Sequence, residues 1–330
     1  MFGWSKKKVL ITGAGGFIGS HLTERLVELG AEVRAFVRYT SRADEGFIKY
    51  LSDGSRDDVD IVYGDIRELE TVAKAMEGAD IVFNLAALVG IPYSYIHPQE
   101  VIEVNTIGTL NVLMAARDAG IEKLVQTSTS EVYGTARYVP INEAHPKQPQ
   151  SPYSASKIAA DAIALSFYNS FELPVAVARP FNTYGPRQSD RAVIPSIISQ
   201  ALVKDKLSLG SMTPTRDFTF VRDTAEGFVK VAEAQESVGM EINIGTGLEI
   251  SIADLIKKIV SLVGRKVDVI CDEERVRPAN SEVERLCADN TVAKDVLGWS
   301  PRVSLTDGLK ETIEFVRENP GFYNPDKYRV

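Results

Sequence analysis

The stretch Val9–Gly19, VLITGAGGFIG, decides the fold of this chain. A short apolar run, typical of a buried β-strand, passes directly into a glycine-rich turn that opens a helix-like stretch. Gly13, Gly16 and Gly19 are spaced GxxGxxG, whereas the GxGxxG fingerprint would place its last small residue at Ile18. Glycines permit a tight turn and a close approach of the backbone to a pyrophosphate, and a helix N-terminus offers free N–H groups. The stretch therefore predicts a dinucleotide-binding turn. A glycine-rich surface loop is the alternative.

Outward from this turn, short β-branched runs alternate with helix-like stretches. The apolar runs are Val9–Thr12, Val33–Val37, Ile61–Tyr63, Ile81–Leu85, Leu124–Ser128 and Val175–Arg179. The helix-like stretches Phe17–Leu29 and Val101–Ala119 are each followed by a glycine, which is the expected stop signal. Continuous apolar strands separated by helices indicate a parallel sheet covered on both faces. We therefore predict an α/β fold with a doubly wound parallel sheet of the Rossmann type.

The alternation weakens after Pro180, where prolines punctuate shorter elements. Asn243–Thr246 has the pattern of one more strand, and helices are expected at Ile252–Val263 and Leu305–Glu318. This change predicts a second, smaller α/β substrate-binding lobe. We expect residues 1–178 to form the dinucleotide-binding domain, with roughly 219–245 returning to it, and residues 179–330 to supply mainly the second lobe.

The composition limits the classes of protein to which the chain can belong. Of its 330 residues 44% are hydrophobic, so a packed core is expected rather than disorder. Two cysteines and three histidines are too few for a disulfide framework or a histidine-rich metal site, and we expect no metal. A net charge of −8 argues against a nucleic-acid partner. Ile81–Gln99 lacks charged residues but contains two prolines, so we expect a strand and a loop there, no membrane partner, and a cytoplasmic protein.

The end of the second predicted strand should read the adenosine ribose of the cofactor. An acid at this place accepts a hydrogen bond from the 2′-hydroxyl of NAD, whereas an arginine favours the 2′-phosphate of NADP. Arg38 and Arg42 lie here without an acid, so we predict NADP, with NAD as the other option. Solvated surface arginines are the alternative. Asp65, after the third strand, could accept a bond from the adenine amino group or serve as a turn residue.

Two polar clusters carry the candidate chemistry. Tyr153 and Lys157 are four residues apart on a predicted helix and therefore share a face. A nearby ammonium lowers the pKa of a phenol from about 10, so that the tyrosinate can remove a hydroxyl proton. Thr129, Ser130 and Glu131 follow the fifth strand, at the sheet edge where ligands bind in open α/β folds. Ordinary helix-surface and strand-exit residues are the alternatives for both clusters.

Together these motifs resemble the extended short-chain dehydrogenase/reductases of the NAD-dependent epimerase/dehydratase family. The motifs that carry the resemblance are Thr12–Gly19, Asn84–Ala87, Asn105–Thr109, Ser128–Gly134, Tyr153–Lys157, Arg179–Pro186 and Arg216–Asp223. We predict that the cofactor is bound by Gly13, Gly16, Phe17, Ile18, Gly19, Arg38, Asp65, Ile66, Leu85, Ala86, Ala87, Asn105, Tyr153 and Lys157.

Within this family the segment Thr129–Glu131 separates two activities. The 4-epimerases usually have small uncharged residues after the first hydroxyl residue, whereas 4,6-dehydratases have a carboxylate pair or Ser-Glu. The segment resembles that of GDP-mannose 4,6-dehydratases and of N-acetylglucosamine-nucleotide 4,6-dehydratases in legionaminic-acid pathways. The resemblance implies that Tyr153 takes the C4 hydroxyl proton while Thr129 binds that oxygen. Glu131 then removes the C5 proton, and Ser130 or a water assists the departure of the C6 hydroxyl.

The resemblance also implies roles for the second lobe and for assembly. It places Asn182, Arg216 and Arg277 at the diphosphate of a nucleotide-sugar substrate, although a salt bridge between Arg216 and Asp217 is the alternative. It further implies a homodimer formed through the helices predicted at 101–119 and 153–171. A 4-epimerase and a non-catalytic NADP sensor remain the rival functions.

Overall fold

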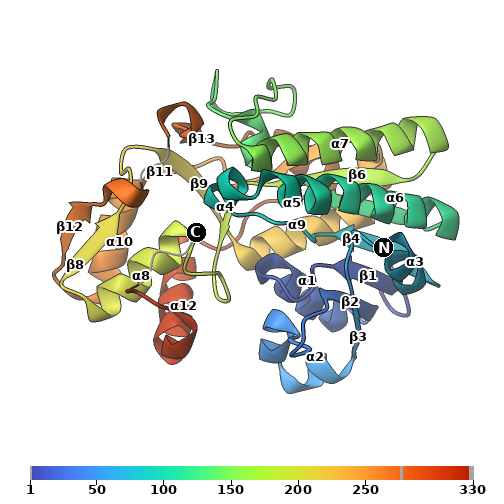
Figure 1. The fold of residues 1–330 in the computed structure, drawn as a ribbon, viewed down its shortest axis with the longest axis horizontal. Helices are drawn as coiled ribbons and strands as arrows, with labels where there is room; N and C mark the ends of the chain where they lie inside the picture. Colours follow the sequence, from blue (N-terminus) through green and yellow to red (C-terminus); the bar gives the residue numbers. More distant parts are fainter. Residues whose placement is uncertain (1, 276–277, 327–330) are drawn as a thin grey trace.

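The large lobe is built on a seven-stranded sheet in which every pair of neighbouring strands is parallel (Figure 1). The structure, a computed structural model, describes residues 2–275 and 278–326. The strand order is β10-β6-β5-β4-β1-β2-β3. The strands are β1 (Lys8–Thr12), β2 (Glu32–Arg38), β3 (Val59–Gly64), β4 (Ile81–Asn84), β5 (Lys123–Thr127), β6 (Val175–Pro180) and β10 (Glu241–Ile244). This order confirms the predicted doubly wound sheet and puts the switch point between β1 and β4, where ligands bind in such folds.

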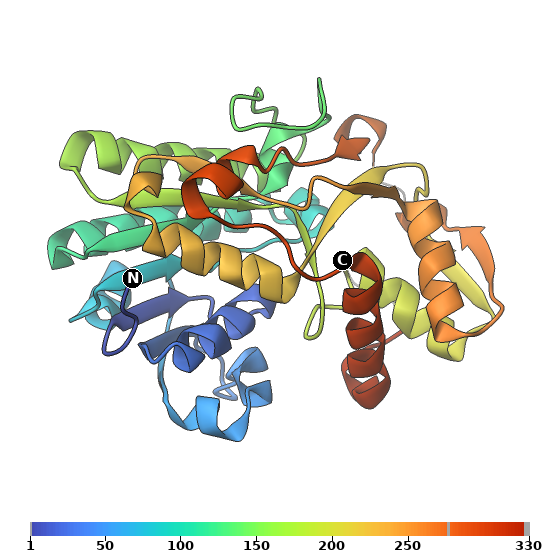
Figure 2. The ribbon, with the colours of Figure 1, turned by 180° about the vertical axis from the view of Figure 1, so that it is seen from behind.

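Helices cover both faces of the sheet. Figure 1 shows one face and Figure 2 the reverse view. One apolar layer includes residues of α3 (Leu69–Met76), α6 (Gly108–Ala119) and α7 (Pro152–Phe171). The other includes residues of α1 (Phe17–Glu28), α9 (Val221–Glu233) and α11 (Thr291–Leu297). Coverage on both sides explains why the strands are apolar without alternation.

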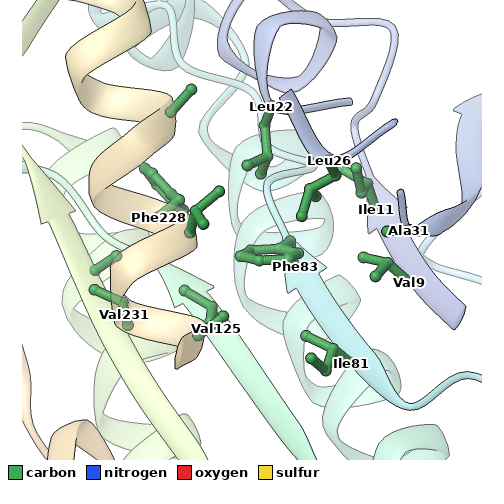
Figure 3. Close-up of a cluster of buried hydrophobic side chains, with 14 of the residues drawn as sticks. Val9, Ile11, Leu22, Leu26, Ala31, Ile81, Phe83, Val125, Phe228 and Val231 are labelled. Carbon is green, nitrogen blue, oxygen red and sulfur yellow. The ribbon is translucent and has the colours of Figure 1, made fainter. Parts of the chain in front are cut away.

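The core under α1 and α9 joins segments that are far apart in the chain (Figure 3). Phe83 of β4 and Phe228 of α9 are both fully buried there. Leu22 and Leu26 of α1 are also fully buried in the same cluster, one turn apart on the helix. The packing holds α1, and with it the glycine-rich turn at its start, against the centre of the sheet.

The predicted helix at 101–119 falls on three elements rather than one. They are the end of α5 (Pro98–Ile102), a π-helical turn, η2 (Glu103–Ile107), and α6; a further short helix, α4 (Ile91–Ile96), precedes them. Asn105, in this turn, accepts a hydrogen bond from the Leu88 amide at 2.8 Å and donates to the Leu88 carbonyl at 3.0 Å. It also donates to the Ser156 hydroxyl of α7 at 2.9 Å. These tertiary contacts accompany the local departure from α-helical geometry, which sequence periodicity does not reveal.

The smaller lobe is a mixed assembly of short strands and three helices. A sheet of four strands centres on β9, which pairs in parallel with β7 and β13 and antiparallel with β11. Its strands are β7 (Asn182–Tyr184), β9 (Thr215–Phe220), β11 (Glu249–Ser251) and β13 (Arg285–Leu286). A parallel pair, β8 (Lys206–Leu209) and β12 (Asp268–Cys271), lies beside it. The helices are α8 (Val193–Val203), α10 (Ile252–Val263) and α12 (Leu305–Glu318).

The chain crosses between the lobes more than once. After β9 in the small lobe, α9 returns to pack on α1, and β10 adds the seventh strand beside β6. The domain boundary at residue 178 and the return of roughly 219–245 to the first domain both stay predictions. Within residues 2–275 and 278–326, no helix is both long and apolar enough to cross a membrane.

Candidate active site

The glycine-rich turn leaves no room for a side chain at Gly13 or Gly19. Gly13 has a φ of 70°, and a Cβ there would lie 2.8 Å from the Ala86 amide nitrogen. A Cβ on Gly19 would lie 2.2 Å from the Gly13 carbonyl oxygen. Gly16 precedes α1 without a side-chain cap, so the first N–H groups of the helix remain for a ligand. The turn therefore fits the pyrophosphate of a dinucleotide, with Phe17 and Ile18 in the first helical turn.

The segment that follows β2 folds over the same turn. The Phe47 amide donates to the Gly15 carbonyl at 2.9 Å, and Gly46, with a φ of 65°, approaches the Gly15 backbone closely. This contact places the segment carrying Arg42 beside the pyrophosphate turn. Arg38, the last residue of β2, is exposed.

Asp65, predicted to bind adenine, is already engaged. Arg67 donates to its carboxylate through Nε at 3.0 Å and Nη2 at 2.6 Å, and through its amide at 2.9 Å. The hydrogen bond from the Arg67 side chain lowers the pKa of Asp65. An adenine amino group would therefore share this carboxylate with Arg67. The neighbouring Ile66 is buried, and its carbonyl accepts from Asn111 at 2.9 Å.

Two predicted cofactor residues after β4 have amides that are used within the protein. The Thr12 hydroxyl accepts hydrogen bonds from the Leu85 and Ala86 amides, both at 3.1 Å, and donates to Asn84 at 2.6 Å. These contacts tie the ends of β1 and β4 together at the switch point. The three residues after β4 are half-buried, namely Leu85, Ala86 and Ala87. Because the Leu85 and Ala86 amides already donate to Thr12, these residues would contact a cofactor through other atoms.

Three successive residues at the end of β5 contact three residues of α7. The Thr127 carbonyl accepts from the Lys157 ammonium at 2.5 Å, and the Ser128 hydroxyl donates to Asp161 at 2.5 Å. Thr129, the next residue, lies close enough for its hydroxyl to lower the pKa of Tyr153. Tyr153, Lys157 and Asp161 succeed one another at four-residue intervals, so one face of α7 meets the strand end.

The predicted lowering of the Tyr153 pKa by Lys157 is wrong for this geometry. Burial raises the pKa of Tyr153, and the negative charges of Glu131 and Asp161 raise it further, while the hydrogen bond with Thr129 lowers it. The Lys157 ammonium is directed to the Thr127 carbonyl. Burial lowers the pKa of Lys157 itself to about 8, against the opposing effect of Asp161.

Ser130 and Glu131 begin the short 3-10 helix η3 (Ser130–Tyr133), which Thr129 caps by accepting the Glu131 amide at 3.2 Å. The cap directs the chain away from the sheet directly after β5. Ser130 is buried, whereas Glu131 is half-buried. In the described part of the chain, the Glu131 carboxylate has no hydrogen-bond or ion-pair partner. A carboxylate near Tyr153 is thus left for a substrate.

In the small lobe, Asn182 begins β7, and its buried Oδ1 has no hydrogen-bond partner in the described chain. Arg216 of β9 pairs with Glu282 at 3.1 Å and donates to the Thr215 carbonyl at 2.9 Å. The alternative pairing of Arg216 with Asp217 is wrong, because Asp217 accepts from the Thr246, Gly247 and Ala288 amides. Arg277, the third predicted diphosphate residue, lies outside the described residues.

Sequence reasoning missed the polar groups directly behind Tyr153 and Lys157. Arg179 and Asp161 form an ion pair at 3.0 Å in which both side chains are fully buried. An acid four residues after Lys157 on the same predicted helix face was the available signal for Asp161. Arg179 ended a predicted strand, but only the pairing of β6 with β5 brings it to Ser128, to which it donates at 3.2 Å.

A family model described as GDP-mannose 4,6 dehydratase matches residues 10–312. The chain belongs to the NAD-dependent epimerase/dehydratase family. It is therefore an NDP-sugar-modifying enzyme of this family, whose members include 4,6-dehydratases and 4-epimerases.

Individual relatives represent both activities. The UDP-glucose 4-epimerase of Mycolicibacterium smegmatis is 35% identical over 317 residues, covering 94% of this chain and 98% of the relative. The dTDP-D-glucose 4,6-dehydratase of Homo sapiens is 33% identical over 328 residues, which cover 96% of this chain and 91% of the relative. The structure of DesIV, a dTDP-glucose 4,6-dehydratase of Streptomyces venezuelae solved with NAD, has a TM-score of 0.85 at 29% identity. The match covers 97% of this chain and 100% of the DesIV chain.

Proposed function

We propose that the protein is an NDP-sugar 4,6-dehydratase that forms an NDP-4-keto-6-deoxy sugar from an NDP-hexose. The substrate class that we favour is an NDP-N-acetylglucosamine. The observation that carries the proposal is the Glu131 carboxylate, which lies near Tyr153 and has no side-chain partner in the described chain. A 4-epimerase needs no base at C5, so such a group would have no use in that reaction.

Tyr153 and Thr129 would act at the C4 oxygen. Thr129 lies close enough to lower the pKa of Tyr153, so a C4 hydroxyl placed between them would donate its proton to Tyr153 in the tyrosinate form while Thr129 holds the oxygen. A nicotinamide cofactor, when bound, accepts the C4 hydride and returns it to C6, so the reaction is redox neutral. Lys157, whose ammonium donates to the Thr127 carbonyl in this structure, would supply a donor for the nicotinamide ribose.

Glu131 would act at C5 once the ketone at C4 has made that hydrogen acidic. Its carboxylate takes the C5 proton, and Glu131 returns that proton to C5 after C6 is reduced. The C6 hydroxyl leaves as water with a second proton, which balances the one that Tyr153 took from the C4 hydroxyl. Ser130, the neighbouring residue, or a bound water would assist the departure of the C6 hydroxyl. The net reaction is the loss of one water molecule from the hexose.

For the cofactor we propose NADP, while NAD is the cofactor in the DesIV structure. Arg38 is exposed at the end of β2, and the segment carrying Arg42 folds over the glycine-rich turn, which supports a site for a 2′-phosphate. Competition titration of the cofactor-free protein tests this choice. We expect NADP to bind more tightly. A preference for NAD of about tenfold, equivalent to roughly 1.4 kcal/mol, would overturn it.

A homodimer is proposed through α5, η2, α6 and α7. The support is a group of exposed apolar side chains on these elements, namely Ile102, Ile107, Tyr168 and Phe171. Sedimentation analysis of the wild-type protein, compared with an Ile107→Glu and Phe171→Glu double variant, would test it. A wild-type protein that sediments as a monomer would contradict the proposal.

Product analysis tests the function directly. The protein is incubated with UDP- and GDP-linked glucose, mannose and N-acetylglucosamine, and products are identified by mass spectrometry and NMR. Loss of one water with formation of a 4-keto-6-deoxy sugar is expected for at least one of them. An epimer of unchanged mass would favour the 4-epimerase, and no product with any of them would favour the NADP sensor.

The Glu131→Gln variant then tests the residue that carries the proposal. Glutamine keeps the size of the side chain but cannot take the C5 proton, so the variant should stop after oxidation at C4 with reduced cofactor accumulating. Exchange of the C5 hydrogen with deuterated water should fall by about 10²–10⁴. Glu131→Asp, which keeps the carboxylate, is the matched control and should retain part of the exchange. Wild-type elimination by Glu131→Gln would remove Glu131 from the mechanism.

A further inference from the structure

Asp161 is a buried carboxylate that the proposed reaction does not use. It lies on α7 one turn beyond Lys157, and its side chain is fully buried. Its Oδ2 accepts hydrogen bonds from the Ser128 hydroxyl at 2.5 Å and from Arg179 Nη2 at 3.0 Å. Its Oδ1 is buried and has no hydrogen-bond partner among the residues that the structure describes. An ionised carboxylate in such a place is costly unless its charge is balanced nearby.

Arg179 supplies part of that balance and connects Asp161 to the sheet. The guanidinium also donates to the Tyr133 hydroxyl at 2.6 Å and to Glu241 at 2.7 Å. Glu241 in turn pairs with the half-buried Lys147 at 2.5 Å. Arg179 thus serves two carboxylates, so the ammonium of Lys157, on the same face of α7, is the other positive charge toward which Asp161 acts.

The contacts with β5 give Asp161 a mechanical role as well. Thr127 and Ser128 bind Lys157 and Asp161 respectively, and Thr129, the next residue, lies close enough to Tyr153 to lower its pKa. A rotation or shift of α7 would break all three contacts together. The contact between Ser128 and Asp161 involves no group proposed to react, and it is the one that Arg179 anchors from β6.

We propose that Asp161 is a positioning residue of the active site, which locks α7 to β5 and β6 through Ser128 and Arg179 and supplies the negative charge that keeps Lys157 an ammonium beside Tyr153. The proposal rests on the proposed function only in taking Tyr153 and Lys157 as the acid–base pair. It assigns a role to a residue that touches neither substrate nor cofactor.

The surrounding charges determine the direction of the effect. Lys157 and Tyr153 share α7 with Asp161, while Arg179 of β6, Glu241 of β10 and Glu131 of η3 approach from the other elements. On the covering helices, Glu100 and Glu103 bind Tyr93 and Gln99, and Arg117 pairs with Asp118 at the far end of α6. Asp161 raises the pKa of both Lys157 and Tyr153. Removing its charge must therefore lower both pKa values.

The experiment uses the full-length Asp161→Asn variant, which keeps the shape and a hydrogen-bond acceptor. Both limbs of the pH profile of turnover should move to lower pH by about one unit, because loss of the Asp161 charge destabilises the Lys157 ammonium and stabilises the Tyr153 tyrosinate, and one charge at close range shifts a pKa by about that much. A second readout needs no activity: the 13Cε resonance of Lys157 in the ligand-free protein should titrate at lower pH than in the wild type. This titration tests the role of Asp161 even if the proposed reaction is wrong.

Two control variants make the outcomes decisive. Glu241→Gln also removes a carboxylate from Arg179, but Glu241 is not among the charges that act on Lys157 or Tyr153, so both limbs and the Lys157 titration should stay in place. Asp161→Glu restores the charge and should restore the limbs. Lower turnover in Asp161→Asn with unmoved limbs and an unmoved Lys157 titration would overturn the proposal. So would an equal shift in Glu241→Gln.

If Asp161→Asn fails to fold, Ser128→Ala replaces it. This variant keeps the charge of Asp161 but removes the hydrogen bond that joins it to β5. The proposal then requires a fall in turnover with no movement of the Lys157 titration to lower pH. Wild-type turnover in Ser128→Ala would overturn the positioning role.

Discussion

Each lobe contains an ion pair between an arginine and a carboxylate, and the two pairs differ in burial and in what they leave for a ligand. Arg179 and Asp161, in the large lobe, have fully buried side chains and are joined to Ser128 and Tyr133. In the small lobe, the side chains of Arg216 and Glu282 are 8% and 15% exposed, and Arg216 is expected to hold a diphosphate. The first pair serves the structure behind the reacting groups, whereas the second must change partners or share them when a substrate binds.

The difference between the two ion pairs suggests that the large lobe governs turnover and the small lobe governs substrate affinity. The groups proposed to react are positioned by contacts between β5 and α7 that exist without a ligand. A diphosphate that binds at Arg216, as the resemblance implies, would have to compete with an internal ion pair, so part of its binding free energy would be spent on reorganisation. Variants in the large lobe should therefore change turnover or stability, and variants in the small lobe should change affinity.

The largest effect is expected for Tyr153→Phe. The variant loses the hydroxyl that is proposed to exchange a proton with the C4 oxygen, so turnover should fall by about 10²–10⁴. Nucleotide binding, measured by calorimetry, should stay within a few-fold of the wild type because the small lobe is unchanged. Wild-type turnover in this variant would show that Tyr153 takes no part in the reaction and that the large lobe does not determine turnover in the way proposed.

Arg179→Met should mainly affect stability. It leaves the Asp161 carboxylate buried without its cationic partner, and breaking a buried pair in this way costs about 3–5 kcal/mol. Denaturant unfolding gives the free energy of unfolding, with Arg216→Met as the matched control. A similar loss in both variants would show that the two pairs do not differ in their structural role.

Arg216→Gln should weaken the binding of a nucleotide diphosphate while turnover at saturation is retained. A hydrogen bond to a charged group is worth about 1.5–3 kcal/mol, so Kd should rise by roughly 10–150-fold. The measurement is a titration with UDP and GDP. An unchanged Kd for both nucleotides would place the diphosphate elsewhere.

The smallest effect is expected for Glu282→Gln. Loss of the negative charge next to Arg216 removes an internal competitor, so the nucleotide should bind more tightly, by a few-fold at most, since the pair is only partly shielded from solvent. The gain should shrink at high salt. Weaker binding would mean that Glu282 itself holds the ligand.

Much of the large lobe could be predicted from local sequence. Val9–Thr12 and the other apolar runs form strands because both faces of a parallel sheet are covered, and this burial leaves a continuous apolar pattern. In the small lobe, the helices at Ile252–Val263 and Leu305–Glu318 also have the predicted bounds, because each has a serine cap and an apolar stripe. The π-helical turn at Asn105 escaped prediction, since its contacts come from Leu88 and Ser156.

The candidate site divides in the same way. The sequence by itself determined the glycine-rich turn, the pairing of Tyr153 with Lys157 on one helix face, and the position of Glu131 directly after a strand, because each depends on neighbours within a few residues. Only the tertiary structure decided that Lys157 faces the Thr127 carbonyl, that Arg216 pairs with Glu282 rather than Asp217, and that Arg179 lies behind the site. These pairings join residues 18 to 66 positions apart, and only packing of the sheet and helices brings such groups within hydrogen-bonding distance.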